Sequence, residues 1–262
     1  MYEQALKLRR DSYTLRQIAD SIEREHSYRL SEATISSWTR GINAPNRAGH
    51  VFIPKPSPDL AYVIGVETGD GFLNVKRKTY QYRIRLRAVD REFVEAFNQA
   101  VSKVLGCPPH RLWKGNENET EVEFGSYLLH KFLLQDVQQL REFIEHDKEC
   151  VAAFLRGFFD SEGSVDTEGR LTASNTDLEL LRYVQDLLDR FFGIQTTGPH
   201  PGKKKGTILT RRGKSYVRNL DCYYIYVRTA ELITFYREIG LTIERKKSRL
   251  EKKLRLQSIP AE

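Results

Sequence analysis

The 262-residue chain is long enough for one large domain or two modest ones. Hydrophobic residues make up 40% and aromatic residues 11%, which excludes wholesale disorder. No apolar run approaches the roughly 20 residues of a membrane span, and the charged N-terminal sequence is unlike a secretory signal. The three isolated cysteines exclude a disulfide framework and a cysteine zinc site. We therefore expect an intracellular protein, cytoplasmic or organellar, with no membrane partner.

Basic residues outnumber acidic ones, with 42 Lys and Arg against 35 Asp and Glu, so the net charge is +7. Residues 1–55 and 151–262 are net basic, whereas residues 56–150 are net acidic. Positive charge gathered in particular segments favours a polyanionic partner such as nucleic acid. The alternative is ordinary surface charge that keeps the protein soluble.

The N-terminal 50 residues are predicted to form a small all-α unit. Apolar spacing and capping residues indicate helices over residues 2–10, 14–26 and 31–41. The last two resemble a helix-turn-helix, whose final helix enters the major groove of DNA. The residues expected to contact bases are Thr34, Ser36, Ser37 and Arg40. The alternative is a helical packing unit with no role in DNA binding.

A proline-rich linker over residues 51–58 separates this unit from a duplicated region. LAYVIGVETGDG (60–71) matches VAAFLRGFFDSEG (151–163), and later landmarks repeat at a similar offset. Residues 59–150 and 151–262 each follow the order helix, two strands, helix, two strands, helix. We therefore expect an α+β fold with two pseudo-symmetric αββαββα halves in one monomer.

Small residues recur four positions apart in both repeated helices, at Gly65 and Gly69 and at Gly157 and Ser161. Residues at this spacing share one helical face. Without bulky side chains there, two helix backbones can approach closely, as in small-xxx-small pairs. These four residues are the predicted helix interface.

Each repeated helix ends in one carboxylate, Asp70 or Glu162, followed by glycine. Close packing would bring these like charges together at negative helix C-termini, which requires compensating cations. Oxygen ligands select hard divalent ions, so Mg²⁺ is the expected cofactor. A metal held by two carboxylates beneath a basic surface suits phosphodiester hydrolysis. The alternative is two ordinary acids in exposed turns.

The paired motifs resemble those of monomeric, double-motif LAGLIDADG homing endonucleases, over residues 58–255. The resemblance implies two antiparallel four-stranded sheets that form a saddle over DNA, and Mg²⁺-dependent, staggered cleavage of both strands. It implies that Asp70 and Glu162 are the metal-binding catalytic acids. It also implies that the backbone carbonyls of Gly69 and Ser161 help to coordinate metal.

The same resemblance implies a basic catalytic residue near each metal site. Lys246, with Lys247 as a close alternative, is the candidate in the second half, and Lys148 is the candidate in the first. One position departs from the family pattern, because Glu67 stands where an apolar residue is usual. We expect Glu67 either to form a peripheral salt bridge or to weaken the helix interface.

Alternating residues of segment 80–88 indicate a strand with one apolar and one cationic face. Arginines on one face suit contacts to phosphates and to guanine. The DNA-contacting residues expected in this half are Asn74, Lys76, Lys78, Gln81, Arg83, Arg85 and Arg87. Glu119, Glu121 and Glu123 alternate on a later strand. They could accept hydrogen bonds from cytosine, repel phosphate, or face away from DNA.

The second half contains a long basic hairpin over residues 202–219, without an acid between residues 203 and 218. We expect it to extend along the DNA backbone, although such a run can also be a flexible basic loop. The DNA-contacting residues expected in this half are Arg170, Thr172, Ser174, Lys203, Lys204, Lys205, Arg211, Arg212, Lys214, Arg218, Tyr224, Tyr226 and Arg228.

These features together predict a site-specific double-strand DNA endonuclease with an asymmetric target, as encoded in mobile introns. One alternative is a maturase that binds intron RNA on the same fold. Another is a DNA-binding regulator without catalysis. The two intact acids favour cleavage.

Overall fold

The computed structural model describes residues 1–42, 52–69, 71–76, 81–115, 118–211 and 214–257. Its N-terminal unit consists of α1 (Tyr2–Arg10), α2 (Leu15–His26) and α3 (Glu32–Thr39). Thr14 caps α2 and Ser31 caps α3, each accepting a hydrogen bond from a backbone N–H in the first turn. The unit has a small core of its own, built from Ala5, Ile18, Ala19, Ile22, Leu30 and Ile35.

The first repeated helix, α4 (Pro58–Glu67), begins at the last proline of the linker. Pro58 is thus helical and not the final residue of an extended linker as expected, because the fixed φ of proline suits the first helical turn. The Ser57 side chain accepts a hydrogen bond from the Leu60 N–H at 3.2 Å and caps the helix.

The first half continues with β1 (Phe72–Lys76), β2 (Gln81–Ala88), α5 (Arg91–Leu105), β3 (Trp113–Lys114), β4 (Thr120–Gly125) and α6 (Tyr127–Leu133). Its strands form an antiparallel sheet in the order β1-β2-β4-β3. Alternation decides which face is buried: Ile84, Leu86, Val122 and Phe124 are inaccessible, so the intervening polar residues occupy the opposite face. A 3₁₀ turn (Val137–Leu140) and α7 (Arg141–Ile144) lead to the second half.

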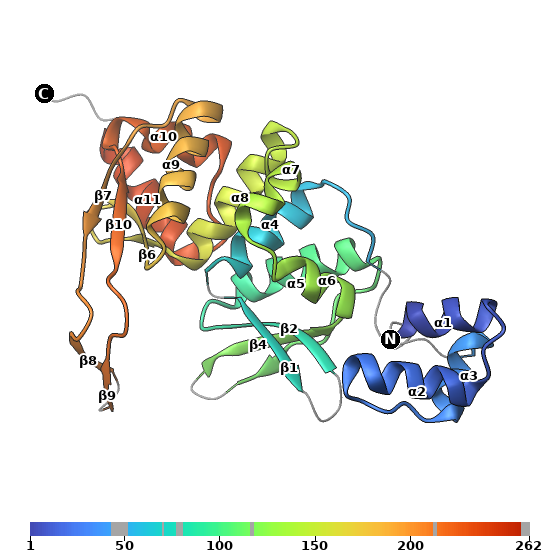
Figure 1. Cartoon of the computed structure of the whole chain (residues 1–262). Helices are drawn as coiled ribbons and strands as arrows, with labels where there is room; N and C mark the ends of the chain where they lie inside the picture. The colour runs from blue at the N-terminus through green and yellow to red at the C-terminus, as the bar shows by residue number, and fades with distance from the viewer. Residues whose placement is uncertain (43–51, 70, 77–80, 116–117, 212–213, 258–262) are drawn as a thin grey trace, which may run out of the picture.

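The second half contains α8 (Lys148–Ser161), β5 (Gly163–Val165), β6 (Leu171–Asn175), α9 (Leu178–Phe192), β7 (Thr196–Pro201), β10 (Tyr223–Val227) and α10 (Leu232–Glu238). Its sheet has the order β5-β6-β10-β7. Between β7 and β10 the chain extends into a separate two-stranded hairpin of β8 (Ile208–Arg211) and β9 (Lys214–Val217). This hairpin projects beyond the sheet (Figure 1). The chain ends with α11 (Glu244–Gln257).

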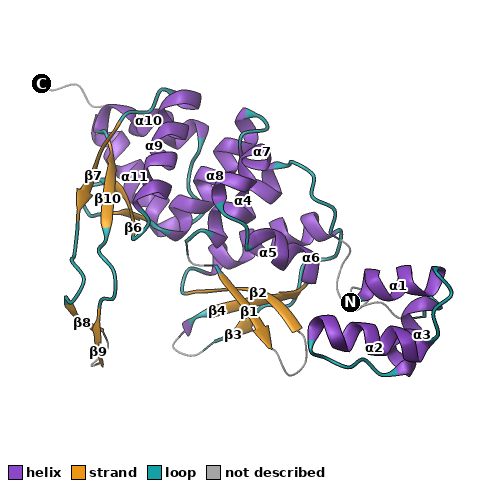
Figure 2. Ribbon diagram, in the orientation of Figure 1, coloured by secondary structure: helices purple, strands orange, loops and turns teal. Residues whose placement is uncertain are grey.

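Both halves therefore have the same element order and the same strand order, once the inserted hairpin is set aside. Helices cover one face of each four-stranded sheet (Figure 2). The second helix of each pattern, α5 or α9, ends at a left-handed glycine, Gly106 with φ 61° or Gly193 with φ 66°. The predicted α+β fold with two αββαββα halves is confirmed.

One continuous core joins the two halves, with α4 and α8 side by side at the centre (Figure 1). Phe154, Phe158 and Phe159 of α8 are fully buried and belong to it. The helices α4 and α8 therefore hold the two sheets together. The C-terminal ends of these helices lie at the junction between the two halves.

Candidate functional site

The two repeated helices approach so closely that only glycine fits at two positions. A Cβ at Gly65 would overlap the Phe154 carbonyl oxygen, and a Cβ at Gly157 would overlap the carbonyl oxygen of Tyr62. Both overlaps involve backbone, which cannot move aside without separating the helices. The small residues of the two motifs thus set the distance between the C-terminal ends of α4 and α8.

At those ends, Gly69 lies against the last residues of the second motif. A Cβ at Gly69 would stand 2.5 Å from the Ser161 Cβ and 2.9 Å from the Glu162 Cγ. The Ser161 hydroxyl donates across the interface to the Val66 carbonyl oxygen at 3.3 Å. Asp70, the acid that follows Gly69 in the sequence, lies outside the described residues. The structure thus brings Gly69, Ser161 and Glu162 together.

Glu162 lies in a cleft of about 340 Å³ lined by Thr68, Gly69, Glu162, Ser174, Asn175, Thr176, Arg218 and Cys222. The Asn175 amide donates to the Glu162 carboxylate, with 3.1 Å between Nδ2 and Oε1. The Asn175 Oδ1 accepts a hydrogen bond from the Asp177 N–H at 2.8 Å. The amide is therefore fixed at both ends and orients the carboxylate. Sequence analysis gave Asn175 no role, because the contact depends on where β6 ends relative to α8.

Arg218 brings a cation into the same cleft from the base of the β8–β9 hairpin. Its backbone is anchored there by hydrogen bonds to Thr207, at 3.0 Å, and to Gly206, at 2.8 Å. The Arg218 Nε is buried and has no hydrogen-bond partner among the described residues. A buried donor without a partner is costly. Arg218 places positive charge in the same cleft as Glu162.

The donors of the cleft suit a hard divalent cation. Glu162 supplies carboxylate oxygens, and the motif backbone at Gly69 and Ser161 lies against it. Within the described ranges, no group of three or more His, Cys, Asp or Glu side chains could hold a metal ion. Metal binding would therefore need Asp70 in addition to Glu162, as the sequence analysis expects, together with backbone carbonyls and water.

The structure does not support the expected position of Lys246 in the cleft. Its side chain is 3% exposed, and Nζ donates to the carbonyl oxygens of Phe159, at 3.0 Å, and Asp160, at 2.6 Å. It thereby neutralises the C-terminal end of α8 from inside the core. Lys246 is not among the residues that line the cleft. Its neighbour Lys247 pairs with Glu244 at 3.7 Å.

The structure likewise does not support the expected position of Lys148 near the acid. It is the first residue of the 14-residue helix α8, and a helix of that length places it about 20 Å from Glu162. Its ammonium pairs with Glu238 at 2.7 Å and lies 5.1 Å from the centre of the Phe192 ring. Among the described residues, neither predicted lysine lines the cleft, whereas Arg218 does.

Glu67 does not form the expected peripheral salt bridge with any described residue. Both carboxyl oxygens are buried and have no hydrogen-bond partner in the described part of the chain, so no peripheral salt bridge forms there. Burial raises the pKa of Glu67 to about 8. Burial thus favours the protonated, uncharged form of this side chain. Glu67 borders a second cavity of about 540 Å³, next to the cleft.

The first sheet places its predicted DNA-contacting residues on the face away from the helices, opposite the buried Ile84 and Leu86. Asn74 lies opposite Arg83, and Phe72 lies opposite Arg85. The three arginines are ion-paired with the three glutamates of the neighbouring segment. The glutamates therefore lie on the same sheet face as the arginines. Lys78 lies outside the described residues, as does the side chain of Lys76.

The second sheet brings Thr172 opposite Tyr226, and Ser174 opposite Tyr224. The Tyr224 and Tyr226 rings are 5.2 Å apart, and Arg228 follows at the same alternation and is exposed. Ser174 also lines the cleft, and its N–H donates to the Glu162 carbonyl oxygen at 3.3 Å.

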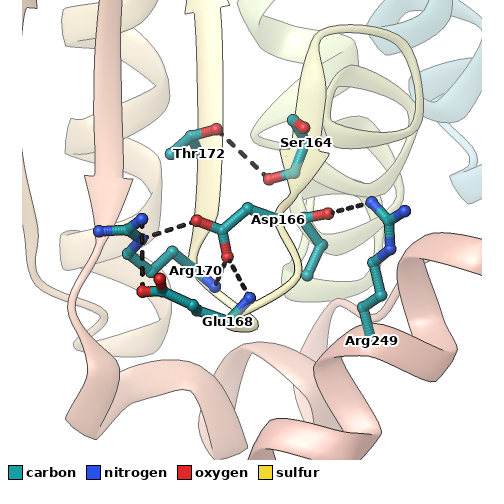
Figure 3. Close-up of polar contacts among 7 residues, drawn as sticks. Ser164, Asp166, Glu168, Arg170, Thr172 and Arg249 are labelled. Atoms are coloured by element: carbon teal, nitrogen blue, oxygen red, sulfur yellow. Dashed lines mark hydrogen bonds and ion pairs between the residues drawn. The ribbon is translucent and has the colours of Figure 1, made fainter.

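Arg170 is not a free cation. Figure 3 shows it held by Asp166 and Glu168, at 2.7 Å and 3.4 Å, within the β5–β6 turn. The Arg249 side chain of α11 donates to the Val165 carbonyl oxygen of the same turn at 2.8 Å. The turn is thus fixed to the last helix.

The basic hairpin retains exposed cations. Lys203, Lys204 and Lys205 are exposed, and Asp221 accepts a hydrogen bond from the Lys205 backbone N–H at 2.7 Å. Arg212 lies outside the described residues, as do the side chains of Arg211 and Lys214.

The predicted base-contacting residues of the N-terminal unit differ in their exposure to solvent. Arg40 is exposed, whereas Ser36 and Ser37 are half-buried. Thr34 is engaged at the start of α3, where its hydroxyl and N–H both contact the Ser31 side chain.

Comparison with known proteins identifies the family to which this architecture belongs. A family model described as a LAGLIDADG-like domain matches residues 149–240, which span α8 to α10. The chain is 35% identical over 251 residues to the uncharacterized protein MJ0398 of Methanocaldococcus jannaschii, which covers 94% of this chain and 90% of the relative. The chain belongs to the LAGLIDADG family.

The solved structures show that the fold of both halves is shared. I-DmoI in complex with DNA and Ca aligns with a TM-score of 0.51 and 20% identity, over 74% of this chain and 97% of that chain. A variant of the homing endonuclease I-DmoI with its target DNA and Mn aligns at 0.50 and 21% identity, over 70% and 93%. This LAGLIDADG protein thus has the two-domain fold of I-DmoI. None of its described helices has the length and apolar character needed to cross a membrane.

Proposed function

We propose that this LAGLIDADG protein is a site-specific double-strand DNA endonuclease that depends on a divalent metal, Mg²⁺ being the natural ion. The observation that supports it most directly is the contact of Gly69 with Ser161 and Glu162 at the junction of the two halves. The residue after Gly69 in the sequence is Asp70, the first-motif acid, which we take to act together with Glu162. A homing endonuclease of a mobile intron, acting as a monomer on an asymmetric target, fits the unequal halves.

Asp70 and Glu162 would hold the metal, with the backbone carbonyls of Gly69 and Ser161 completing its protein ligands. A bound divalent ion would lower the pKa of a water and stabilise the charge that develops on the phosphate and the leaving oxygen. Asn175 orients the Glu162 carboxylate through its amide. Such outer partners of a ligand commonly control metal affinity and activity.

Arg218 is the cation that we assign to the cleft in place of Lys246 and Lys148. It lines the cleft, and its guanidinium would donate to a phosphate oxygen of the DNA placed over Glu162. A positioned guanidinium stabilises charge that increases in the transition state. Because Arg218 stands at the base of the β8–β9 hairpin, seating of that hairpin on DNA would position the guanidinium.

The two sheet faces and the hairpin would form the DNA-binding surface. The exposed lysines of the hairpin suit phosphates, and the polar, aromatic face of the second sheet suits base edges and sugars. The N-terminal unit would add a further contact through α3 and Arg40. The structures of I-DmoI were solved with DNA and with Mn or Ca, which supports DNA and a divalent ion as ligands. They lend no support to intron RNA.

The decisive experiment is a cleavage assay on DNA that spans the insertion site of the gene, with and without Mg²⁺. We expect metal-dependent cuts in both strands, and none after Asp70→Asn combined with Glu162→Gln. DNA binding should survive the double substitution, since it removes like charges from the DNA face. Cleavage by the double variant would overturn the proposed chemistry. Tight intron-RNA binding without DNA cleavage would favour the maturase alternative.

A further inference from the structure

Three arginines of β2 each form an ion pair with a glutamate in or next to β4. We call these pairs the Arg–Glu ladder: Arg83 with Glu123 at 3.1 Å, Arg85 with Glu121 at 3.2 Å, and Arg87 with Glu119 at 3.2 Å. Glu123 stands directly opposite Arg85 in the strand register, so each arginine reaches diagonally to the next glutamate along. The ladder is regular because every pair repeats the same diagonal.

The ladder lies on the sheet face that we assign to DNA, yet its six side chains carry no net charge. The glutamate side chains are 20–24% exposed and the arginines 25–48% exposed, so solvent and ligands can reach them. Exposed ion pairs of this kind contribute little to stability. Stability therefore does not explain why three glutamates oppose the arginines of a DNA-binding face.

The β8–β9 hairpin differs from this face. Lys203, Lys204 and Lys205 form no ion pair within the part of the chain that the structure describes. Arg170, on the second sheet, is paired with two acids. The three arginines of β2 and Arg170 are thus neutralised by acids, whereas the hairpin lysines, which suit the phosphate backbone, are not.

This division matters because binding to arbitrary DNA depends on cations that neutralise phosphates. Because the ladder has no net charge, it adds nothing to the affinity for arbitrary DNA, and its glutamates repel phosphates. In the major groove, guanine offers two acceptors and cytosine one donor. An arginine fixed beside a glutamate offers donors and an acceptor side by side, which complements a G·C pair.

We propose that the Arg–Glu ladder is a specificity-determining element. It keeps the first sheet from binding the phosphate backbone of arbitrary DNA, and its paired donors and acceptors recognise G·C pairs of the target. The proposal rests on the proposed function, in that DNA lies over the two sheets. The hairpin then supplies affinity and the ladder supplies discrimination.

The test compares the full-length protein with Glu121→Gln/Glu123→Gln in binding to a random-sequence duplex over a series of salt concentrations. The variant frees Arg83 and Arg85 for phosphates. We expect about tenfold tighter binding at 0.1 M salt and a plot of log affinity against log salt steeper by about 1 to 2. Binding selected from a randomised duplex library should lose G·C preference at two positions.

The matched control is Glu95→Gln/Glu179→Gln, which changes the net charge equally and also breaks two Arg–Glu pairs, at 2.7 Å and 2.6 Å. These residues lie on α5 and α9, away from the sheet face, and the control should bind like the unmodified protein. Equal effects in both variants, or none in either, would overturn the proposal. If the unmodified protein binds no duplex DNA, the proposed function fails instead.

Discussion

The Asn175 amide nitrogen lies 3.1 Å from the Glu162 carboxylate oxygen, while its amide oxygen accepts the Asp177 N–H. One side chain at the end of β6 thus links the second-motif acid to the start of α9. This arrangement allows the orientation of the acid to be tested separately from its charge.

Replacing Asn175 by Ser should slow cleavage about 10- to 100-fold, because loss of an outer partner of a metal ligand has effects of that size. Serine can still accept the Asp177 N–H in the turn, so the local backbone should be kept. Single-turnover cleavage over a Mg²⁺ titration measures the effect. Unchanged rates at all Mg²⁺ concentrations, with unchanged DNA affinity, would show that the amide does not orient the acid.

Arg218→Gln should lower the cleavage rate about 100-fold, the scale of losing one positioned donor to transition-state charge. Its DNA affinity should change only a few fold, since a single phosphate contact is lost. Arg218→Lys should recover part of the rate. The measurement is single-turnover cleavage at saturating enzyme, beside equilibrium binding to the same duplex.

The contrasting variant is Lys203→Gln/Lys204→Gln/Lys205→Gln in the same hairpin. It should weaken DNA binding and lower the salt dependence of log affinity by about 2 to 3, while the rate at saturating enzyme stays the same. If Arg218→Gln behaved like this triple variant, Arg218 would be a backbone contact and not a residue of the cleft chemistry.

Gly65→Ala should destabilise the protein by roughly 1–3 kcal/mol or more, because the added methyl overlaps the backbone of α8. Denaturant unfolding measures the change. Gly125→Ala is the matched control, since a Cβ at Gly125 would meet no atom within 4 Å. Similar stabilities for the two variants would contradict the close contact between α4 and α8.

Glu67→Gln should stabilise the protein in a pH-dependent manner. The folded-state pKa of Glu67 is raised from 4.5 to about 8, so the folded state disfavours the charged form. Below pH 4.5 the carboxyl is protonated whether folded or unfolded, and the two proteins should differ little. As the pH rises towards 8, ionisation of the unfolded state lowers the stability of the unmodified protein.

The advantage of Glu67→Gln should therefore grow between pH 4.5 and pH 8 and then level off, at no more than about 5 kcal/mol. Unfolding free energies at several pH values measure it. A constant difference across that range would mean that Glu67 is hydrated in the folded protein. Glu142→Gln, at an exposed position, serves as the control.

The sequence by itself determined the repeated element order, the strand alternation and the small residues of the two motifs. These features are local: period two buries Ile84 and Leu86 and turns the arginines of β2 outward, and spacing of four places Gly65 and Gly69 on one helical face. These features were sufficient to predict the fold and the close contact of the two motif helices at Gly69 and Ser161.

Only the tertiary structure decided which charges meet. The pairing of β2 with β4 brings Arg85 within reach of Glu121. The packing of α11 buries Lys246 in the core, and the second strand of the hairpin leads Arg218 to the cleft. Each of these contacts joins residues far apart in the chain, so no local period encodes it. The sequence shows which residues are basic and which are acidic. Whether a basic side chain is paired with an acid or remains free to bind a ligand depends on the neighbours that the fold places beside it.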